Sequence, residues 1–226
     1  MLRFTLFGFP VTIHWMFFVV LAILGGGLDA GTPEQFQTLV IWVLAGSISV
    51  LIHELGHAFL MRNCGARVVI LLQGLQGLAI PDRAFPWKQD ILISFAGPGV
   101  QIIMGVAARW LLSISTGDAW YVTAFLRSFY EISIVWAVIN LLPIFPLDGG
   151  HVLRSALGPA KWRLTLVLSI ACAIAVGVFV LLASFSPALA RLVPVPFSHY
   201  LAPFNALMVG FLAFANYQRL QSGAQH

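Results

Sequence analysis

Three ionisable residues with a regular spacing, His53, Glu54 and His57, lie within the apolar segment LVIWVLAGSISVLIHELGHAFLM. His53 and His57 are four residues apart, so on a helix both imidazoles project from one face. Two ring nitrogens so placed can bind one tetrahedral zinc ion at about 2.0–2.1 Å. Glu54 lies one step round the helix, which suits a base that holds a water molecule better than a third ligand. This H-E-x-x-H pattern predicts a hydrolytic zinc site.

The composition places this motif in a membrane protein. Of the 226 residues, 60% are hydrophobic and 9% are charged, against about 45–50% and 25% in globular proteins. So few charges cannot cover a water-soluble domain of this size, which excludes an ordinary soluble enzyme. The net charge is +4, but the 12 basic residues are scattered between apolar runs, so we expect no nucleic-acid partner.

An ionisable side chain near the bilayer centre costs about 2.5–3.5 kcal/mol on insertion scales, so the motif needs partners and, ordinarily, a function. A polar patch that only packs helices together is the alternative explanation.

The apolar segments predict the fold. A membrane span needs about 20 mostly apolar residues. We expect an all-α membrane protein with about six transmembrane helices, forming a single domain over residues 1–226. The expected spans are Val11–Gly27, Leu39–Met61, Ile91–Leu112, Val122–Leu147, Leu164–Ala183 and Pro203–Tyr217.

The loops between these spans predict the orientation. Seven of the 12 basic residues fall in the second and fourth loops, which the positive-inside rule places in the cytoplasm together with both termini. The histidine pair is then near the cytoplasmic end of its span. The seven residues are Arg62, Arg67, Arg83, Lys88, Arg154, Lys161 and Arg163.

Asp148 is the candidate for the third protein ligand of a zinc ion. It follows Pro143 and Pro146, which break the helix, and it precedes Gly149–Gly150, which allow a tight turn. The topology puts it at the same cytoplasmic end as the histidine pair, so we expect its carboxylate at a similar depth. A solvated aspartate is the alternative.

Residues 53–57 (HELGH) together with residues 140–150 (NLLPIFPLDGG) resemble the site-2 protease family of intramembrane zinc metalloproteases. Residues 8–15 (GFPVTIHW) and 95–101 (FAGPGVQ) are also similar to that family, so the resemblance covers about the first 160 residues. Gln101 stands where the family pattern has asparagine. We see no PDZ or CBS-like insertion and expect a short prokaryotic-type member.

The resemblance implies an activity and its site. We expect one zinc ion per chain at His53, His57 and Asp148, with Glu54 as the general base. The reaction is hydrolysis of a peptide bond in or near a transmembrane segment of a membrane-protein substrate, as in regulated intramembrane proteolysis. The family pattern also assigns Asn140 to the substrate or the oxyanion, with an interhelical polar contact as the alternative.

We therefore expect a multi-pass protein of a prokaryotic cell membrane, and the loop charges put its active site toward the cytoplasm. The segment Val68–Ile80 is too short and too broken by glycine to be a span. It is similar to the family's re-entrant β segment, which can pair with an extended substrate strand. A hairpin lying on the membrane surface is the alternative. His14 fits an interfacial or packing role better than that of a fourth ligand.

Three other functions are weighed against this one. A metal transporter needs repeated polar sites along a pathway, whereas the chain has one cluster. A catalytically inactive homologue that binds membrane segments would most simply lose Glu54, which is present. A membrane protease of the prenyl-protein type needs a downstream glutamate as third ligand, and Glu131 falls on the predicted outer side.

Overall fold

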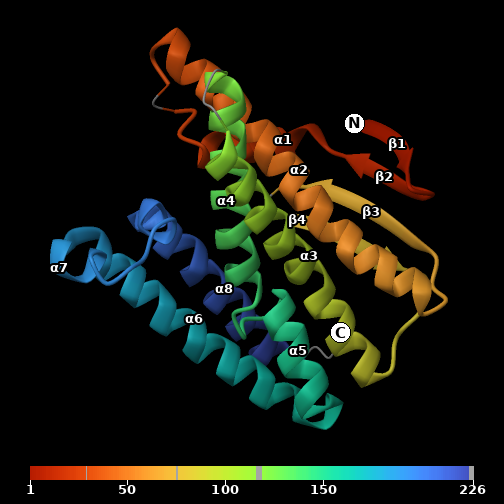
Figure 1. Cartoon of the computed structure of the whole chain (residues 1–226). Helices are drawn as coiled ribbons and strands as arrows, with labels where there is room; N and C mark the ends of the chain where they lie inside the picture. Colours follow the sequence, from red (N-terminus) through yellow and green to blue (C-terminus); the bar gives the residue numbers. More distant parts are fainter. Residues whose placement is uncertain (29, 75, 116–118, 224–226) are drawn as a thin grey trace. The chain divides into compact units, whose positions relative to one another are not determined.

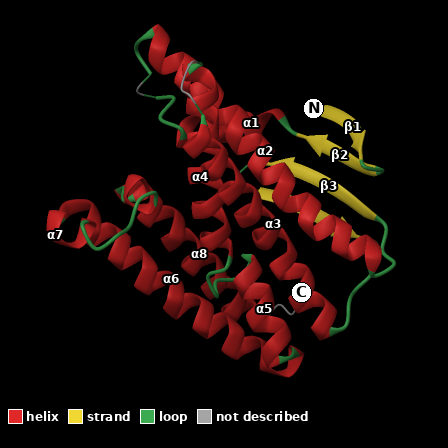
Figure 2. Cartoon of the chain, viewed as in Figure 1, coloured by secondary structure: helices red, strands yellow, loops and turns green. Residues whose placement is uncertain are grey.

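The computed structural model describes residues 1–28, 30–74, 76–115 and 119–223, which are mostly helical with one small sheet (Figures 1 and 2). In chain order the elements are β1 (Leu2–Leu6), β2 (Phe9–Ile13), α1 (Trp15–Leu24), α2 (Pro33–Asn63), β3 (Val68–Gln73), β4 (Gln76–Pro81), α3 (Trp87–Ile114), α4 (Trp120–Asn140), α5 (Asp148–Leu157), η1 (Pro159–Lys161), α6 (Trp162–Phe185), α7 (Pro187–Ala190), η2 (Phe197–Tyr200) and α8 (Pro203–Ser222).

The chain divides into two compact units. The first unit comprises Met1–Phe85 and Phe95–Ala137, and the second comprises Pro86–Ser94 and Val138–His226. One division falls just before α3, one falls inside α3 and one falls inside α4. That residues 1–226 act as a single domain stays a prediction.

The first unit is built on a four-stranded sheet in the order β1-β2-β3-β4. The outer pairs are antiparallel hairpins, whereas β2 and β3 run parallel with Val11 opposite Ile70. Alternate residues of β2 and β3 are buried against α1 and α2, as expected for strands with one covered face. This core contains Phe9, Val11, Ile13, Val68, Ile70 and Leu72 from the sheet and Phe17, Leu21, Val50, Leu55 and Ala58 from the helices.

The β structure predicted at Val68–Ile80 is confirmed, because β3 and β4 pair as an antiparallel hairpin. Its re-entrant position in the membrane stays a prediction. The hairpin formed by β1 and β2 was not predicted. As a consequence, the expected span Val11–Gly27 is wrong at its start, because β2 extends to Ile13 and leaves α1 only ten residues.

The long helix α2 begins with a capping box. The Thr32 hydroxyl accepts from the Gln35 backbone N–H at 3.3 Å, and the Gln35 side chain accepts from the Thr32 N–H at 3.1 Å. Pro33 at the first helical position has no N–H to lose. The start of α2 is thus defined by local sequence, and the motif residues follow about six turns later.

Four of the six expected spans correspond to described helices that are long and apolar enough to cross a membrane: α2, α3, α4 and the stretch Pro159–Phe185. The ten-residue α1 is too short. The 20-residue α8 lies outside this set, because Asn205, Asn216 and Arg219 lower its mean hydropathy. These four described helices support the prediction of a membrane protein, whereas the expected number of six spans is not confirmed.

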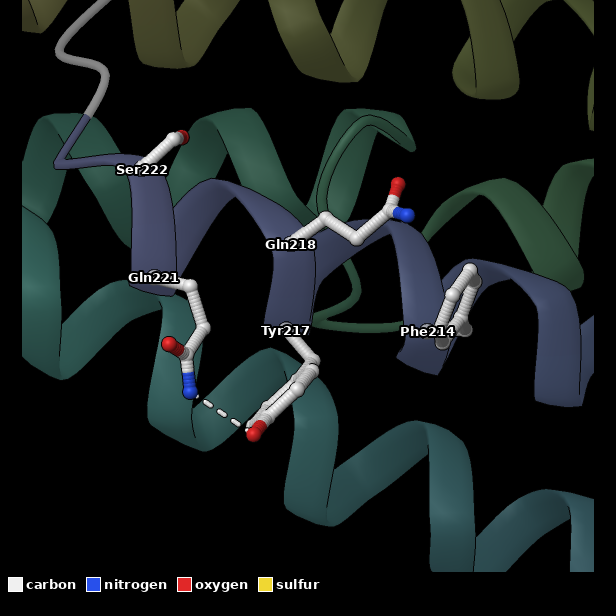
Figure 3. Close-up of a pocket in the computed structure, with 5 residues that line it drawn as sticks. All are labelled: Phe214, Tyr217, Gln218, Gln221 and Ser222. Carbon is white, nitrogen blue, oxygen red and sulfur yellow. Dashed lines mark hydrogen bonds between the residues drawn. The ribbon is translucent and has the colours of Figure 1, made fainter.

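In the second unit, α6 packs along α8, and both contact the loop that follows α4 (Figure 1). Figure 3 shows the C-terminal part of α8, where Phe214, Tyr217, Gln218, Gln221 and Ser222 line an open hollow. The Gln221 amide donates to the Tyr217 hydroxyl at 2.7 Å. This hollow contains none of the residues for which the sequence predicts chemistry.

Candidate metal centre

His53, Glu54 and His57 lie together in the second half of α2 and are buried, with 4%, 5% and 6% of their surface exposed. The Nε2 atoms of the two histidines are 3.0 Å apart, and the rings meet edge to face at a centroid distance of 4.7 Å. The prediction that both imidazoles share one helix face is confirmed. Two imidazole nitrogens this close together could bind a single metal ion.

Glycines let α3 pack closely against the two histidines. A Cβ on Gly97 would overlap the His57 imidazole, and a Cβ on Gly56 would lie 2.7 Å from the Ala96 carbonyl oxygen. Pro98 lies inside α3, which continues through it as one helix. These close approaches place α3 directly against the motif helix α2.

The Glu54 carboxylate lies against the backbone of β4. A Cβ on Gly77 would overlap the Glu54 side chain at Oε1 and Cγ. Sequence reasoning treated the glycines of this segment only as breaks that prevent a membrane span. A glycine inside a strand often marks a close approach of another group, and that signal could have placed Gly77 at the site.

Three buried polar residues stand behind His53. Its Nδ1 lies 2.9 Å from Gln101 Oε1, and the Gln101 amide continues to Ser49, which bonds to Ser133. Gln101 stood out in the sequence as a departure from the family pattern. Ser49 and Ser133 were missed, although Ser49 is one helical turn before His53 on the same face.

Asp148 belongs to the second unit, where it is half-buried at the first position of α5. A Cβ on Gly149 would overlap the carbonyl oxygens of Leu141 and Leu142, and one on Gly150 would lie 2.5 Å from Phe145 Cα. The prediction of a tight turn at Gly149–Gly150 is wrong, because both glycines are helical. They serve to let the preceding loop fold back over the first turn of α5.

The loop before Asp148 is held by α6 and α8 through Phe145. The Phe145 N–H donates to Ser169 Oγ at 3.1 Å, and its carbonyl oxygen accepts from the Asn216 side chain. Its ring packs edge to face on Trp162 at 5.1 Å, with the Arg219 guanidinium over it at 4.9 Å. Sequence reasoning treated these two helices only as apolar spans and did not predict that they hold the loop before Asp148.

Asn140 is the half-buried last residue of α4. The expected span Val122–Leu147 is wrong at its end, because the chain leaves the helix before Pro143. The role of Asn140 at the substrate stays a prediction, as do those of the other expected site residues.

His14 caps the N-terminus of α1, where its Nδ1 accepts from the Met16 N–H at 3.3 Å. Glu131 pairs with Arg127 at 3.1 Å in the first unit, as its i,i+4 spacing suggests. Both residues therefore have local structural roles.

Comparison with known proteins places this arrangement in a family. The model of peptidase family M50 matches residues 113–184. The chain is 30% identical over 157 residues to a protein named zinc metalloprotease from Methanocaldococcus jannaschii, covering 68% of this chain and 44% of that protein. It is 34% identical over 146 residues to stage IV sporulation protein FB of Bacillus subtilis, covering 63% and 46%.

The chain thus spans less than half the length of these two relatives. The fold is similar to that of the site-2 protease from Methanocaldococcus jannaschii, with a TM-score of 0.65 and 22% identity over 96% of this chain and 94% of that one. The H-E-x-x-H helix, the membrane-length helices and these matches agree, and the chain belongs to peptidase family M50, the family of the site-2 proteases.

Proposed function

We propose that this protein is a zinc-dependent intramembrane endopeptidase that hydrolyses a peptide bond in or near a transmembrane segment of a membrane-protein substrate. The observation that carries the proposal is the buried motif on α2. His53 and His57 present converging Nε2 atoms, Glu54 lies beside them, and the helix is long and apolar enough to cross a membrane. The relatives named zinc metalloprotease support it.

We further propose one zinc ion per chain, held by His53, His57 and Asp148. Two imidazoles and one carboxylate are a set of side chains that could hold a metal ion, and zinc prefers these donors with one position left open in catalytic sites. When bound there, zinc supplies Lewis acidity that acidifies a water molecule and polarises the substrate carbonyl.

Glu54 moves the proton in this proposal. Its carboxylate is next to the histidine pair and is buried, so it can accept the proton of the attacking water and deliver it to the leaving nitrogen. The Asn140 amide is proposed to donate a hydrogen bond to the oxygen that becomes negative.

The substrate is proposed to bind as an extended strand along β4. A transmembrane helix hides its carbonyl groups in internal hydrogen bonds, so the segment to be cut must first unwind. β4 is the last strand in the sheet order, and its Gly77 lies against Glu54. A strand added at this edge would satisfy its backbone groups and bring a peptide bond close to the base.

Replacing Gly77 by alanine tests this arrangement. The added methyl group needs the space that Glu54 Oε1 occupies, so we expect cleavage to fall by about tenfold or more, in line with the roughly 10²-fold losses that small displacements of catalytic groups can cause. Zinc content should not change. Gly99→Ala is the matched control, because a Cβ at Gly99 meets nothing within 4 Å. Equal activity of the two variants would contradict the proposed contact.

Reconstitution tests the activity itself. Purified protein in liposomes, loaded with zinc, should cut a set of single-span test proteins at discrete bonds, and a zinc chelator should stop the cleavage. A zinc-sensitive dye trapped inside the vesicles tests the metal-transporter alternative in the same preparation. Zinc flux across the vesicle membrane without any cleavage would favour the transporter and contradict the protease.

Orientation has its own test. We propose that the second and fourth loops and both termini are cytoplasmic, in the membrane of a prokaryotic cell. In a chain with Cys64 and Cys172 replaced by alanine, cysteines introduced at Arg67 and Lys161 should react with an impermeant reagent only after the membrane is opened. Labelling of either position from outside intact cells would overturn the proposed topology.

A further inference from the structure

A chain of hydrogen bonds runs through the buried centre of the first unit, behind the histidine pair. His53 Nδ1 lies 2.9 Å from Gln101 Oε1. Gln101 Nε2 lies 2.8 Å from Ser49 Oγ, and Ser49 Oγ lies 2.8 Å from Ser133 Oγ. Gln101, Ser49 and Ser133 have no exposed surface, and together they connect α2, α3 and α4.

The donors and acceptors of this chain fix its direction. An amide nitrogen only donates, and Gln101 Nε2 faces the Ser49 hydroxyl and, at 3.5 Å, the Ser49 carbonyl oxygen. Gln101 Oε1 therefore faces His53 and can only accept. The proton of the neutral imidazole must then be on Nδ1, which leaves the lone pair of Nε2 directed at His57 Nε2.

We infer that Gln101 is a positioning residue for the metal site, because it selects the tautomer and the ring orientation in which His53 can bind a metal through Nε2. This inference rests on the proposed zinc site. Histidine ligands usually donate their second N–H to an oxygen acceptor, and loss of that acceptor typically lowers metal affinity by about 10–100-fold. Here the acceptor is a neutral amide that is itself anchored by a serine.

The face of α3 around Gln101 is built for this contact. Gly97, Gln101 and Gly105 are spaced by four residues and lie on one side of the helix. A Cβ on Gly97 would overlap the His57 ring, and a Cβ on Gly105 would lie 2.9 Å from Ser133 Cβ. The two glycines thus let α3 lie close enough for one glutamine side chain to reach both His53 and Ser49.

A hydrogen-bond network that only packs helices together would have the same contacts. The test must therefore separate that packing role from the orientation of His53 for metal binding. Gln101→Met keeps the length of the side chain and removes the acceptor for His53. Gln101→Glu keeps an oxygen acceptor and can still take a hydrogen bond from Ser49. Ser133→Ala is the matched control, since it removes a hydroxyl from the far end of the same network and leaves the His53–Gln101 contact in place.

The measurement uses metal alone. The zinc affinity of each purified variant is obtained by competition with a chromophoric chelator, and the visible spectrum of the Co²⁺-loaded protein reports the ligand geometry. We expect Gln101→Met to bind zinc about 10–100-fold more weakly and to change the Co²⁺ spectrum. Gln101→Glu should stay close to the original protein in both readouts. Ser133→Ala should lower only the thermal stability.

Wild-type zinc affinity in Gln101→Met, or an equal loss in Ser133→Ala, would overturn the inference. If Gln101→Met does not fold, Ser49→Ala replaces it, because the amide then loses its anchor. A loss of affinity larger than that of Ser133→Ala supports the role, and an equal loss rejects it. Failure of the unmodified protein to bind zinc would instead reject the proposed metal site, so the two failures are distinguishable.

Discussion

Glu54→Gln should leave zinc bound and slow the cleavage of a transmembrane substrate by about 10²–10⁴-fold, the usual cost of losing a general base. Glutamine keeps the length of the side chain and its place beside the histidine pair and Gly77. It cannot accept a proton from water, so the nucleophile forms slowly. The fold should survive, because a buried carboxylate is more costly to desolvate than an amide.

Glu34→Gln provides the matched control for this substitution. Glu34 lies in the exposed first turn of the same helix, so the chemical change is identical but remote from the motif. The two variants are compared by single-turnover cleavage in liposomes and by zinc content. Turnover of Glu54→Gln at the rate of the Glu34→Gln control would sink the proposed mechanism and move the inactive-homologue or transporter alternatives ahead.

The motif on α2 could be predicted because its chemistry is local. A helix places residues four apart on one face whatever surrounds it, so His53 and His57 were paired correctly before the fold was known. The apolar spans were predictable for a similar reason, since a helix must cross about 30 Å of hydrocarbon. The predicted ends of two spans were wrong, at β2 and at the end of α4, because a continuous apolar stretch there contains both a helix and a strand or loop.

Contacts between distant segments could not be predicted from spacing. Gly77 against Glu54, and Gln101 against His53, join elements separated by tens of residues, and one sequence holds no information on their register. The sequence does show which polar residues lie within apolar segments, although not what they contact. Ser169 and Asn216 lie in apolar helices where polar groups are costly, and each holds the backbone of Phe145.

The largest expected effect is loss of the metal from Asp148→Ala and from His57→Ala. Loss of a hydrogen-bond partner of a metal ligand typically lowers metal affinity by about 10–100-fold. Removing one of three protein ligands should lower the zinc affinity by more than that. Elemental analysis after dialysis against a chelator measures it. Asp82→Asn is the control, because that carboxylate accepts from the Arg67 N–H at 2.9 Å in a loop of the first unit and an amide oxygen can still do so.

Asp148→Ala should remove the metal without unfolding the chain, and the structure gives the reason. Asp148 is the first residue of α5, where alanine is an excellent helix former and the lost helix-dipole interaction is worth only about 0.3–1 kcal/mol. The loop before it is fixed independently by Phe145 through Ser169 and Asn216. A variant that is folded by circular dichroism and size-exclusion chromatography yet retains full zinc would remove Asp148 from the proposed site, whereas a zinc-free, folded variant would support its assignment as the third ligand.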